Sequence, residues 1–353
     1  MAVSWLALSL TDRCQLRCQH CLRDPGKQAV DLPLALIERV LDQAQRHYGT
    51  RHVALTGGEP TLHPQLDAVL EAIVARGFTW HLVTNGQRFK ARLLDLLDAR
   101  PPLRQALTAI DFSVEGATAA VHDRIRGAGT FHAAMEAVTL AHLRGLPFVL
   151  QLTVQALNVD QIEAFTLMAS HLGASRVSFG MAQPTGTDFD REMYLSPARW
   201  RSALDDITRM ADCVRIPVSS AHGFPTTQAF QCCEPYRSEI LNVDAHGRLT
   251  LCCQLSGGPG ADGEEVLADL AVTPLPEAHQ RMLDRIHALQ SARNAAIAAC
   301  TLDEGWDMFA CNDCMRRCGK AHWVEGGAAG PRADRPRGRA LPAAVETSDD
   351  PPR

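Results

Sequence analysis

Short apolar segments alternate with longer amphipathic segments over the first 209 residues of the chain. The apolar segments are rich in Val, Ile, Leu and aromatic residues and predict β-strands at 5–10, 52–56, 80–84, 109–114, 148–154 and 176–181. Between strands, segments such as 33–49 and 63–77 show helical spacing and end at glycine. This alternation predicts consecutive βα units with a parallel sheet. Six units favour a partial barrel over a closed eight-fold barrel.

The pattern changes after Pro217. Segment 239–251 alternates apolar and polar residues around Asp244–Gly247, which predicts a β-hairpin with that turn. An acidic, glycine-rich segment and one helix around 279–299 follow. The predicted fold is therefore α/β: a partial (βα)6 TIM-like barrel over 1–213 and a small hairpin and helix domain over 214–325. The tail 326–353 has little apolar content, which predicts disorder.

Composition excludes several classes of partner. The chain has 353 residues, a formal net charge of -5 and a pI near 6.3, so it offers no overall basic character for nucleic acid. No apolar run approaches the roughly 18 residues of a membrane span, and the N-terminus lacks the features of a secretory signal. We expect a cytoplasmic protein. In that reducing compartment its 12 cysteines are expected to be metal ligands or redox groups.

Three of these cysteines, Cys14, Cys18 and Cys21, directly follow the first predicted strand. Their loop is therefore predicted at the carboxyl edge of the sheet, where α/β proteins bind ligands. Three thiolates can hold three irons of a [4Fe-4S] cube and leave the fourth iron open, whereas electron-transfer clusters are normally closed by four cysteines. The alternative is a zinc knuckle that adds His20 to the three cysteines.

The spacing Cys-x3-Cys-x2-Cys after the first strand resembles the radical S-adenosylmethionine (radical SAM) superfamily. A second motif supports this resemblance, because the second strand ends at Gly57, Gly58, Glu59 and Pro60. The resemblance implies a site-differentiated [4Fe-4S] cluster whose open iron binds the amino and carboxylate groups of S-adenosylmethionine. Reductive cleavage then gives a 5′-deoxyadenosyl radical that abstracts a hydrogen atom from the substrate. No catalytic side chain for that step is predicted.

The same resemblance assigns further contacts to S-adenosylmethionine. Glycines allow close approach of the backbone, while backbone carbonyls and the Glu59 carboxylate can accept from the methionyl ammonium. His20 stands where the family usually has an aromatic residue beside adenine, and Glu115 replaces the usual Asp. The remaining predicted cofactor-binding residues lie at the ends of the third, fourth and fifth strands: Asn85, Ser113 and Asn158. A turn at Gln183–Gly186 follows the sixth strand.

A second cysteine group lies in the C-terminal part of the chain. Cys233, Cys252, Cys311 and Cys314 resemble the ligands of a SPASM/Twitch extension, which implies one auxiliary [4Fe-4S] cluster. A structural zinc site with the same four cysteines is the alternative. Cys318 competes for a ligand position, and Cys232 and Cys253 are expected to point elsewhere. Cys213 and Cys300 are expected in the core.

The resemblance leaves two substrate classes open. Most enzymes with this extension modify ribosomally synthesised peptides, and a minority oxidise small metabolites such as amino sugars. We expect no leader-peptide-binding domain before the barrel, so a peptide is expected to dock directly or through a separate recognition protein. A one-electron reductant such as flavodoxin or ferredoxin is also implied. A different class of protein, a non-catalytic iron-sulfur or zinc-binding protein, has no use for an open iron or for the Gly-Gly-Glu-Pro motif.

Overall fold

The computed structural model describes residues 3–23, 28–183, 191–221, 223–224, 233–255, 263–302, 307 and 309–320. The predicted disordered tail, Cys232 and the residues Pro184–Gly186 of the predicted turn lie outside these residues. Among the described residues, no helix is long and apolar enough to cross a membrane.

The described strands form one sheet of ten strands in the order β10-β9-β8-β1-β2-β3-β4-β5-β6-β7. Their bounds are β1 Trp5–Thr11, β2 His52–Gly57, β3 Thr79–Thr84, β4 Leu107–Ser113, β5 Phe148–Val154, β6 Arg176–Met181, β7 Val218–Ser220, β8 Ile240–Val243, β9 Arg248–Thr250 and β10 Val266–Asp269. Strands β1 to β7 are parallel to one another. The six predicted strands and the predicted α/β fold class with a partial barrel are confirmed. The three-residue strand β7 was not predicted, because it is too short to show a pattern.

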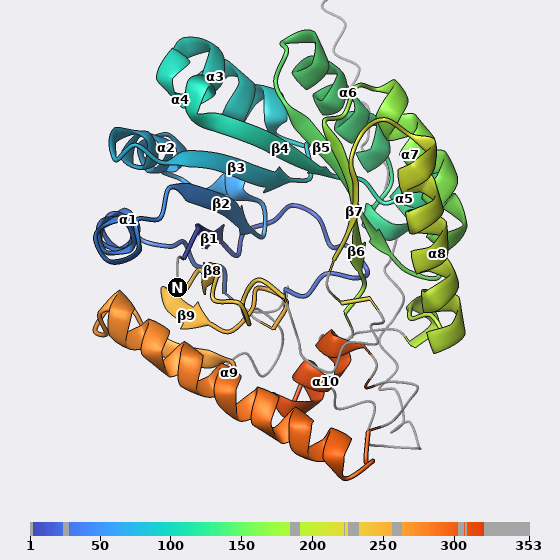
Figure 1. Cartoon of the computed structure of the whole chain (residues 1–353). Coiled ribbons are helices and arrows are strands. Elements are labelled where there is room, and N and C mark those ends of the chain that lie inside the picture. The colour runs from blue at the N-terminus through green and yellow to red at the C-terminus, as the bar shows by residue number, and fades with distance from the viewer. Residues whose placement is uncertain are drawn as a thin grey trace, which may run out of the picture. The chain divides into compact units, whose positions relative to one another are not determined.

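Helices cover the outer side of the curved sheet (Figure 1). They are α1 Leu34–Tyr48, α2 Leu66–Ala75, α3 Asp95–Ala99, α4 Pro101–Ala106, α5 Ala119–Arg126, α6 Thr130–Leu143, α7 Ile162–His171 and α8 Pro197–Cys213. Alternate residues of each strand point outward to this layer, so Leu6, Leu8 and Leu10 of β1 are fully buried. Aromatic residues extend the same core: Phe89 and Phe148 pack edge-on against Phe112, with ring centroids 5.3 and 6.3 Å from it.

The C-terminal hairpin joins the barrel sheet. Strand β8 pairs in parallel with β1, and β9 returns antiparallel to β8, so the predicted hairpin is confirmed. Its turn is held by the Asp244 carboxylate, which accepts from the backbone N–H groups of His246 and Arg248 at 3.0 and 2.8 Å. Gly247 adopts the left-handed φ of 79° that the turn requires.

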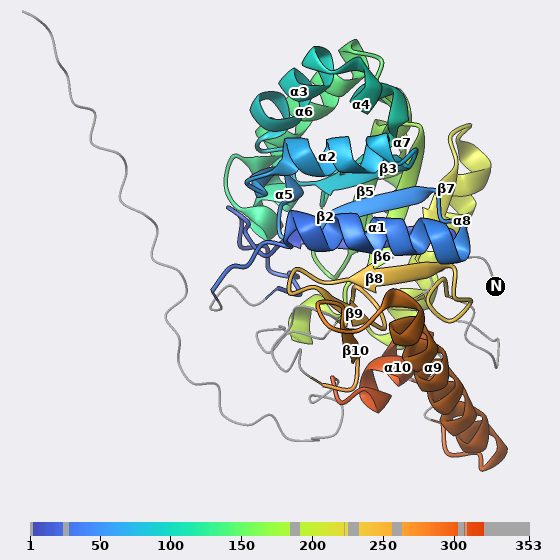
Figure 2. The same cartoon turned by 90° about the vertical axis from the view of Figure 1, so that its left-hand side faces the viewer.

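Two helices complete the C-terminal part, α9 Leu275–Ala298 and α10 Ala310–Arg317. Helix α9 was predicted. It runs at a steep angle to α1 in Figure 2, and its first residue meets α1, where Gln43 accepts from the Leu275 backbone N–H at 2.6 Å. Helix α10 was not predicted, because its eight residues contain two cysteines and few apolar positions. Residues 1–321 form one compact unit, and the domain boundary near 213/214 stays a prediction.

The inner face of the barrel carries polar residues. Strand register places Ser9 beside Thr56, and Ser113 beside Gln151. Nearer the amino ends of the strands, burial raises the pKa of Asp111 to about 6, although the Arg176 charge opposes this change. Its Oδ1 has no hydrogen-bond partner among the described residues, and the nearest Arg176 nitrogen lies 3.9 Å from Oδ2. Asp111 therefore destabilises the folded chain when it is ionised.

We expect Asp111→Asn to stabilise the protein at pH 8 and to have little effect at pH 4. The folded-state pKa of about 6 lies above the ordinary value of 3.8, so the protonated side chain favours the folded state and this contribution is lost as the pH rises through 6. A pKa difference of this size corresponds to about 3 kcal/mol. Urea unfolding of both proteins from pH 4 to pH 8 measures the difference in stability. A difference that does not change with pH would mean that Asp111 is ionised throughout.

Candidate active site

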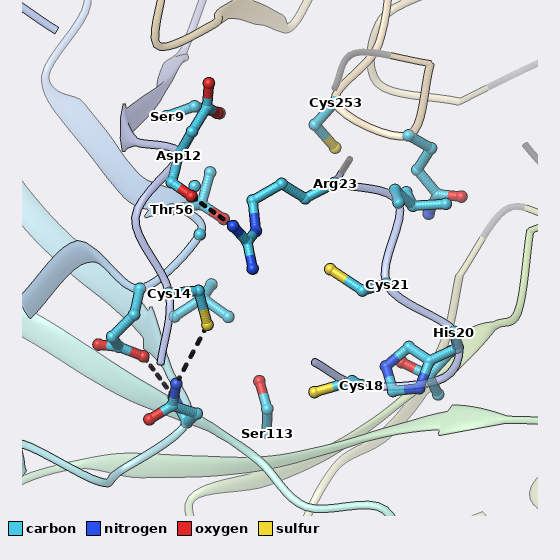
Figure 3. A pocket seen from close by; sticks show the side chains of 18 of the residues that line it. Ser9, Asp12, Cys14, Cys18, His20, Cys21, Arg23, Thr56, Ser113 and Cys253 are labelled. Carbon is cyan, nitrogen blue, oxygen red and sulfur yellow. Dashed lines mark hydrogen bonds between the residues drawn. The ribbon is translucent and has the colours of Figure 1, made fainter. Parts of the chain in front are cut away.

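Three thiols face one cavity at the carboxyl edge of the barrel (Figure 3). The cavity has a volume of about 470 Å³ and is lined by Cys14, Cys18 and Cys21. These cysteines belong to the cysteine loop, residues 12–23, which leaves the end of β1. Along the loop, exposed side chains alternate with side chains that face the cavity. The three predicted cluster ligands are therefore brought together on one side of the loop.

The loop after β2 packs directly on the cysteine loop. The backbone N–H groups of Gly58 and Glu59 donate to the carbonyl oxygens of Thr11 and Arg13 at 2.6 and 2.7 Å. A Cβ atom at Gly57 would lie 2.5 Å from the Thr11 oxygen, and one at Gly58 would lie 2.3 Å from the Arg13 oxygen. Both glycines are needed for contact between two backbones. The sequence predicted that Gly57 and Gly58 let the backbone approach a ligand. It did not predict their contact with the backbone of residues 11–13.

Glu59 lies at the centre of this contact and is 1% exposed. Its Oε1 accepts from the Thr61 backbone N–H at 3.2 Å and from the hydroxyls of Thr61 and Thr84 at 2.6 and 2.8 Å, while Oε2 accepts from the Asn85 backbone N–H at 2.8 Å. Burial raises the pKa of Glu59, and these hydrogen bonds oppose the change. The carboxylate thus joins the ends of β2 and β3, and it also lines the cavity.

His20, Glu115 and Arg126 form a buried charged group. Glu115 Oε1 lies 2.6 Å from Arg126 Nη2 and 3.3 Å from His20 Nε2, and Oε2 accepts from the Thr153 backbone N–H at 2.9 Å. Burial alone would raise the pKa of Glu115, but His20 and Arg126 hold it below its usual range. Burial lowers the pKa of His20. His20 and Arg126 line the cavity, whereas Glu115 stands behind them.

The other predicted contacts divide into two sets. Asn85 and Ser113 line the cavity, and Asn85 Nδ2 donates to Cys14 Sγ at 3.7 Å. Asn158 does not line it: its Nδ2 donates to the carbonyl oxygens of Glu115 and Thr153 at 3.2 and 3.0 Å, so it holds the ends of β4 and β5. Pro60 begins the 3-10 helix η1, Pro60–Leu62, and is buried. The structure therefore does not bring Pro60, Glu115 and Asn158 to the cavity wall, and their assignment to the cofactor stays a prediction.

Several cavity residues were missed by sequence reasoning. They come from the cysteine loop, α5, β6 and the C-terminal hairpin, and include Arg23, Arg126, Met181, His246, Arg248 and Cys253. Arg23 braces the cysteine loop by donating to the carbonyl oxygens of Asp12 and Leu16 at 2.8 and 3.2 Å. Arg126 ends the sequence His122–Arg126, whose His-Asp-x-x-Arg spacing was the one available signal for it. The hairpin residues carried no sequence signal, because β8 was not known to pair with β1.

Partial burial favours the protonated form of two cavity thiols, Cys14 and Cys18, in the chain alone. Burial raises the pKa of Cys18 to about 11, with the Arg126 charge opposing the change. Burial also raises the pKa of Cys14. A thiolate ligand must be deprotonated, so a metal that binds here has to displace protons. The nearby Arg126 guanidinium favours the thiolate form.

The second cysteine group lies where the hairpin meets α10. Cys233 precedes β8, Cys252 follows β9, and α10 presents Cys311 and Cys314. The thiols are close enough to affect one another: burial raises the pKa of Cys311, and the neighbouring Cys252 and Cys233 raise it further. Burial raises the pKa of Cys233 to about 12. All four predicted auxiliary ligands are therefore neighbours.

The remaining described cysteines lie beside the second group or apart from it. Cys318 ends α10 and interacts with the Cys314 side chain, and it accepts from Arg285 Nη2 at 3.9 Å. Cys253 lines the first cavity (Figure 3), but its thiol also interacts with Cys252 and Cys311, so the prediction that it points away from the second group is wrong. Cys213 and Cys300 are exposed, so the prediction that they belong to the core is wrong. Both lie at helix ends, where side chains reach solvent.

The cavity has the properties that a polar, thiolate-bound cofactor requires. Its wall contains the three thiols of the cysteine loop, that of Cys253, and buried polar atoms that lack partners among the described residues, including Arg23 Nε and both amide atoms of Gln183. Among the described residues, no group of three or more His, Cys, Asp or Glu side chains is placed to hold a single metal ion. In a cubane cluster each thiolate binds a different iron.

A parallel partial barrel with three cysteines on the loop after its first strand defines an α/β protein of the iron-sulfur class. The family model described as "Radical SAM superfamily" matches residues 8–192, and the chain belongs to this superfamily. Membership implies a [4Fe-4S] cluster and S-adenosylmethionine as cofactors.

Curated relatives have similar sequences over about half of their length. PqqA peptide cyclase of Methylobacterium sp. (strain 4-46) is 30% identical over 201 residues, which cover 55% of this chain and 50% of that protein. Mycofactocin maturase MftC of Mycobacterium tuberculosis (strain CDC 1551 / Oshkosh) is 30% identical over 186 residues, which cover 52% of this chain and 46% of that protein.

A solved structure shares the fold. The crystal structure of Streptococcus suis SuiB bound to precursor peptide SuiA superimposes with a TM-score of 0.65 and 13% identity, covering 81% of this chain and 66% of that chain. At this identity the similarity supports the fold alone.

Gly58→Ala should disturb the cysteine loop. The added Cβ would lie 2.3 Å from a backbone oxygen that cannot turn away, and such overpacking costs about 1–3 kcal/mol. We expect a lower melting temperature and less iron bound after anaerobic reconstitution. Gly180→Ala is the control, because its Cβ would find its nearest neighbour at 3.8 Å. Equal iron content in the two variants would contradict the role of this contact.

Proposed function

We propose that this protein is a radical SAM enzyme that reductively cleaves S-adenosylmethionine and abstracts a hydrogen atom from a ribosomally synthesised peptide. The observation that carries the proposal is the cavity itself, in which Cys14, Cys18 and Cys21 face Glu59 from the loop after β2. The family membership supports the cofactor chemistry, and the names of the relatives support the substrate class.

Cys14, Cys18 and Cys21 would hold the cluster, and together with S-adenosylmethionine it supplies a 5′-deoxyadenosyl radical when bound. The chain's own residues prepare this site. Asn85 donates to the Cys14 sulfur, and the Arg126 charge lies beside Cys18, so both favour thiolates. Glu59 presents a buried negative charge to the cavity, which suits the methionyl ammonium. His20 lies on the wall where the adenine is expected, held by Glu115.

The second cysteine group is proposed to hold one auxiliary [4Fe-4S] cluster. Its support is the proximity of Cys233, Cys252, Cys311 and Cys314. Tyr236 Oη donates to Cys314 Sγ at 3.8 Å, a contact that would stabilise a thiolate. Cys318 remains the rival ligand, since it lies on the same face of α10 as Cys314. Zinc on the same four thiols is the alternative that metal analysis can decide.

The peptide substrate is supported by relatives that are named as a peptide cyclase and a maturase. Since this chain matches about half of their length, the substrate is a proposal for this protein. A one-electron reductant, such as flavodoxin or ferredoxin, and a separate peptide-recognition protein are proposed partners.

We expect anaerobically reconstituted protein to bind about eight irons and eight sulfides. Replacing Cys14, Cys18 and Cys21 together by Ala should leave about four irons, and Cys311→Ala with Cys314→Ala should also leave about four, because the two thiol groups are separate. The second variant should still cleave S-adenosylmethionine. Zinc in the second group, with iron only in the first, would refute the auxiliary cluster.

Glu59→Gln should weaken S-adenosylmethionine binding at least about tenfold, since charge-assisted hydrogen bonds contribute about 1.5–3 kcal/mol. The substitution also costs stability, because both carboxylate oxygens accept from backbone N–H groups and a Gln amide must face one of them. Thr84→Val is the matched control: it removes one hydrogen bond to Glu59 but no charge. Calorimetry and thermal unfolding separate the two effects. Equal affinities in both variants would make Glu59 a structural residue only.

A further inference from the structure

Gln183 is a buried amide without a partner among the described residues. It follows β6 at the carboxyl edge of the barrel, lines the cavity and is 4% exposed. Neither Nε2 nor Oε1 has a hydrogen-bond partner in the part of the chain that the structure describes. A buried, unpaired amide destabilises a folded protein, and native structures seldom retain one unless something completes it. This side chain therefore indicates a bound group.

The two atoms define the chemistry of that group. A carboxamide presents a donor and an acceptor side by side, so it complements a ligand with an adjacent acceptor and donor. The N–H and C=O of one residue in an extended peptide have this arrangement, and so does the edge of adenine. Two molecules in the proposed reaction offer an adjacent acceptor and donor: the peptide substrate and the adenine of S-adenosylmethionine.

The position of Gln183 favours the peptide. A Cβ at Gly223 would lie 2.8 Å from Gln183 Nε2 and 3.3 Å from Cys311 Sγ, so the amide lies beside the second cysteine group. The cysteine loop, which would hold the methionyl end of the cofactor, leaves β1, five positions away in the sheet order. Met181 gives this wall an apolar surface next to the amide.

We infer that Gln183 binds the backbone of one extended substrate residue, donating from Nε2 to the carbonyl oxygen of that residue and accepting at Oε1 from its N–H. This rests on the proposed function, because it presumes a peptide in the cavity. Such contacts recognise no particular side chain, so Gln183 would position the backbone of any peptide presented there. Gln183 is therefore proposed as a substrate-binding residue.

The test uses reconstituted holoenzyme loaded with S-adenosylmethionine and the probe N-acetyl-trialanine amide, whose backbone carries minimal side chains. Gln183→Met keeps the volume and removes the amide. Gln151→Met is the control, because Gln151 lines the same cavity but has no buried unpartnered atom among the described residues. Saturation-transfer NMR titration measures affinity for the probe, calorimetry measures affinity for S-adenosylmethionine, and thermal unfolding measures stability.

We expect Gln183→Met to weaken probe binding about tenfold, since a buried partner left unpaired is costly, and to leave S-adenosylmethionine affinity unchanged. Its melting temperature without probe should rise by about 2 °C, because an unpaired amide is removed; a merely structural Gln would lower it. A loss of S-adenosylmethionine affinity would assign the amide to adenine and overturn the inference. Probe binding that is absent in the parent or equal in all three proteins would also overturn it.

These outcomes are independent of those for the proposed function. If the parent protein cleaves S-adenosylmethionine and loses iron as expected in the cysteine variants, a failed Gln183 test removes only this inference. If the parent binds no cluster, the proposed function itself fails.

Discussion

The contact between the loop after β2 and the cysteine loop is the constraint on which the site depends. Two backbone hydrogen bonds join Gly58 and Glu59 to Thr11 and Arg13, and no side chain fits between the two backbones. This contact sets the path of the cysteine loop, and the path turns its three thiols toward the cavity. The Gly-Gly-Glu-Pro motif therefore shapes the proposed cluster site before any cofactor is bound.

Buried charges around the cavity are satisfied by backbone groups. Glu59 accepts from the N–H groups of Thr61 and Asn85, and Glu115 accepts from Thr153 as well as from Arg126. Fixed donors of this kind hold a carboxylate in place at low dielectric. They also mean that each carboxylate joins the ends of neighbouring strands. Structural and chemical roles are thus combined in the same side chains, which is why single substitutions there need matched controls.

The pairing of β8 with β1 attaches the C-terminal hairpin to the barrel sheet, and this places the second cysteine group near the cysteine loop. Hairpin residues enter the first cavity, where His246 Nε2 lies 3.6 Å from Asp12 of the cysteine loop. At the end of the hairpin, Cys252 joins the second group while its neighbour Cys253 faces the first cavity. One short segment therefore touches both sites. A substrate held between them would lie against Gln183, which borders both regions.

The order of strands and helices, the fold class, the hairpin turn and the two cysteine groups could be predicted from the sequence, because periodicity, turn residues and spacing are local properties. Strand β7 and helix α10 were too short to give such a signal. Only the tertiary structure decided that Gly58 packs on the cysteine loop, that Asn158 holds backbone and that Gln183 lacks a partner among the described residues. These features depend on contacts between segments far apart in the chain, and an amino-acid sequence records neither the distance between such segments nor the direction in which a side chain points.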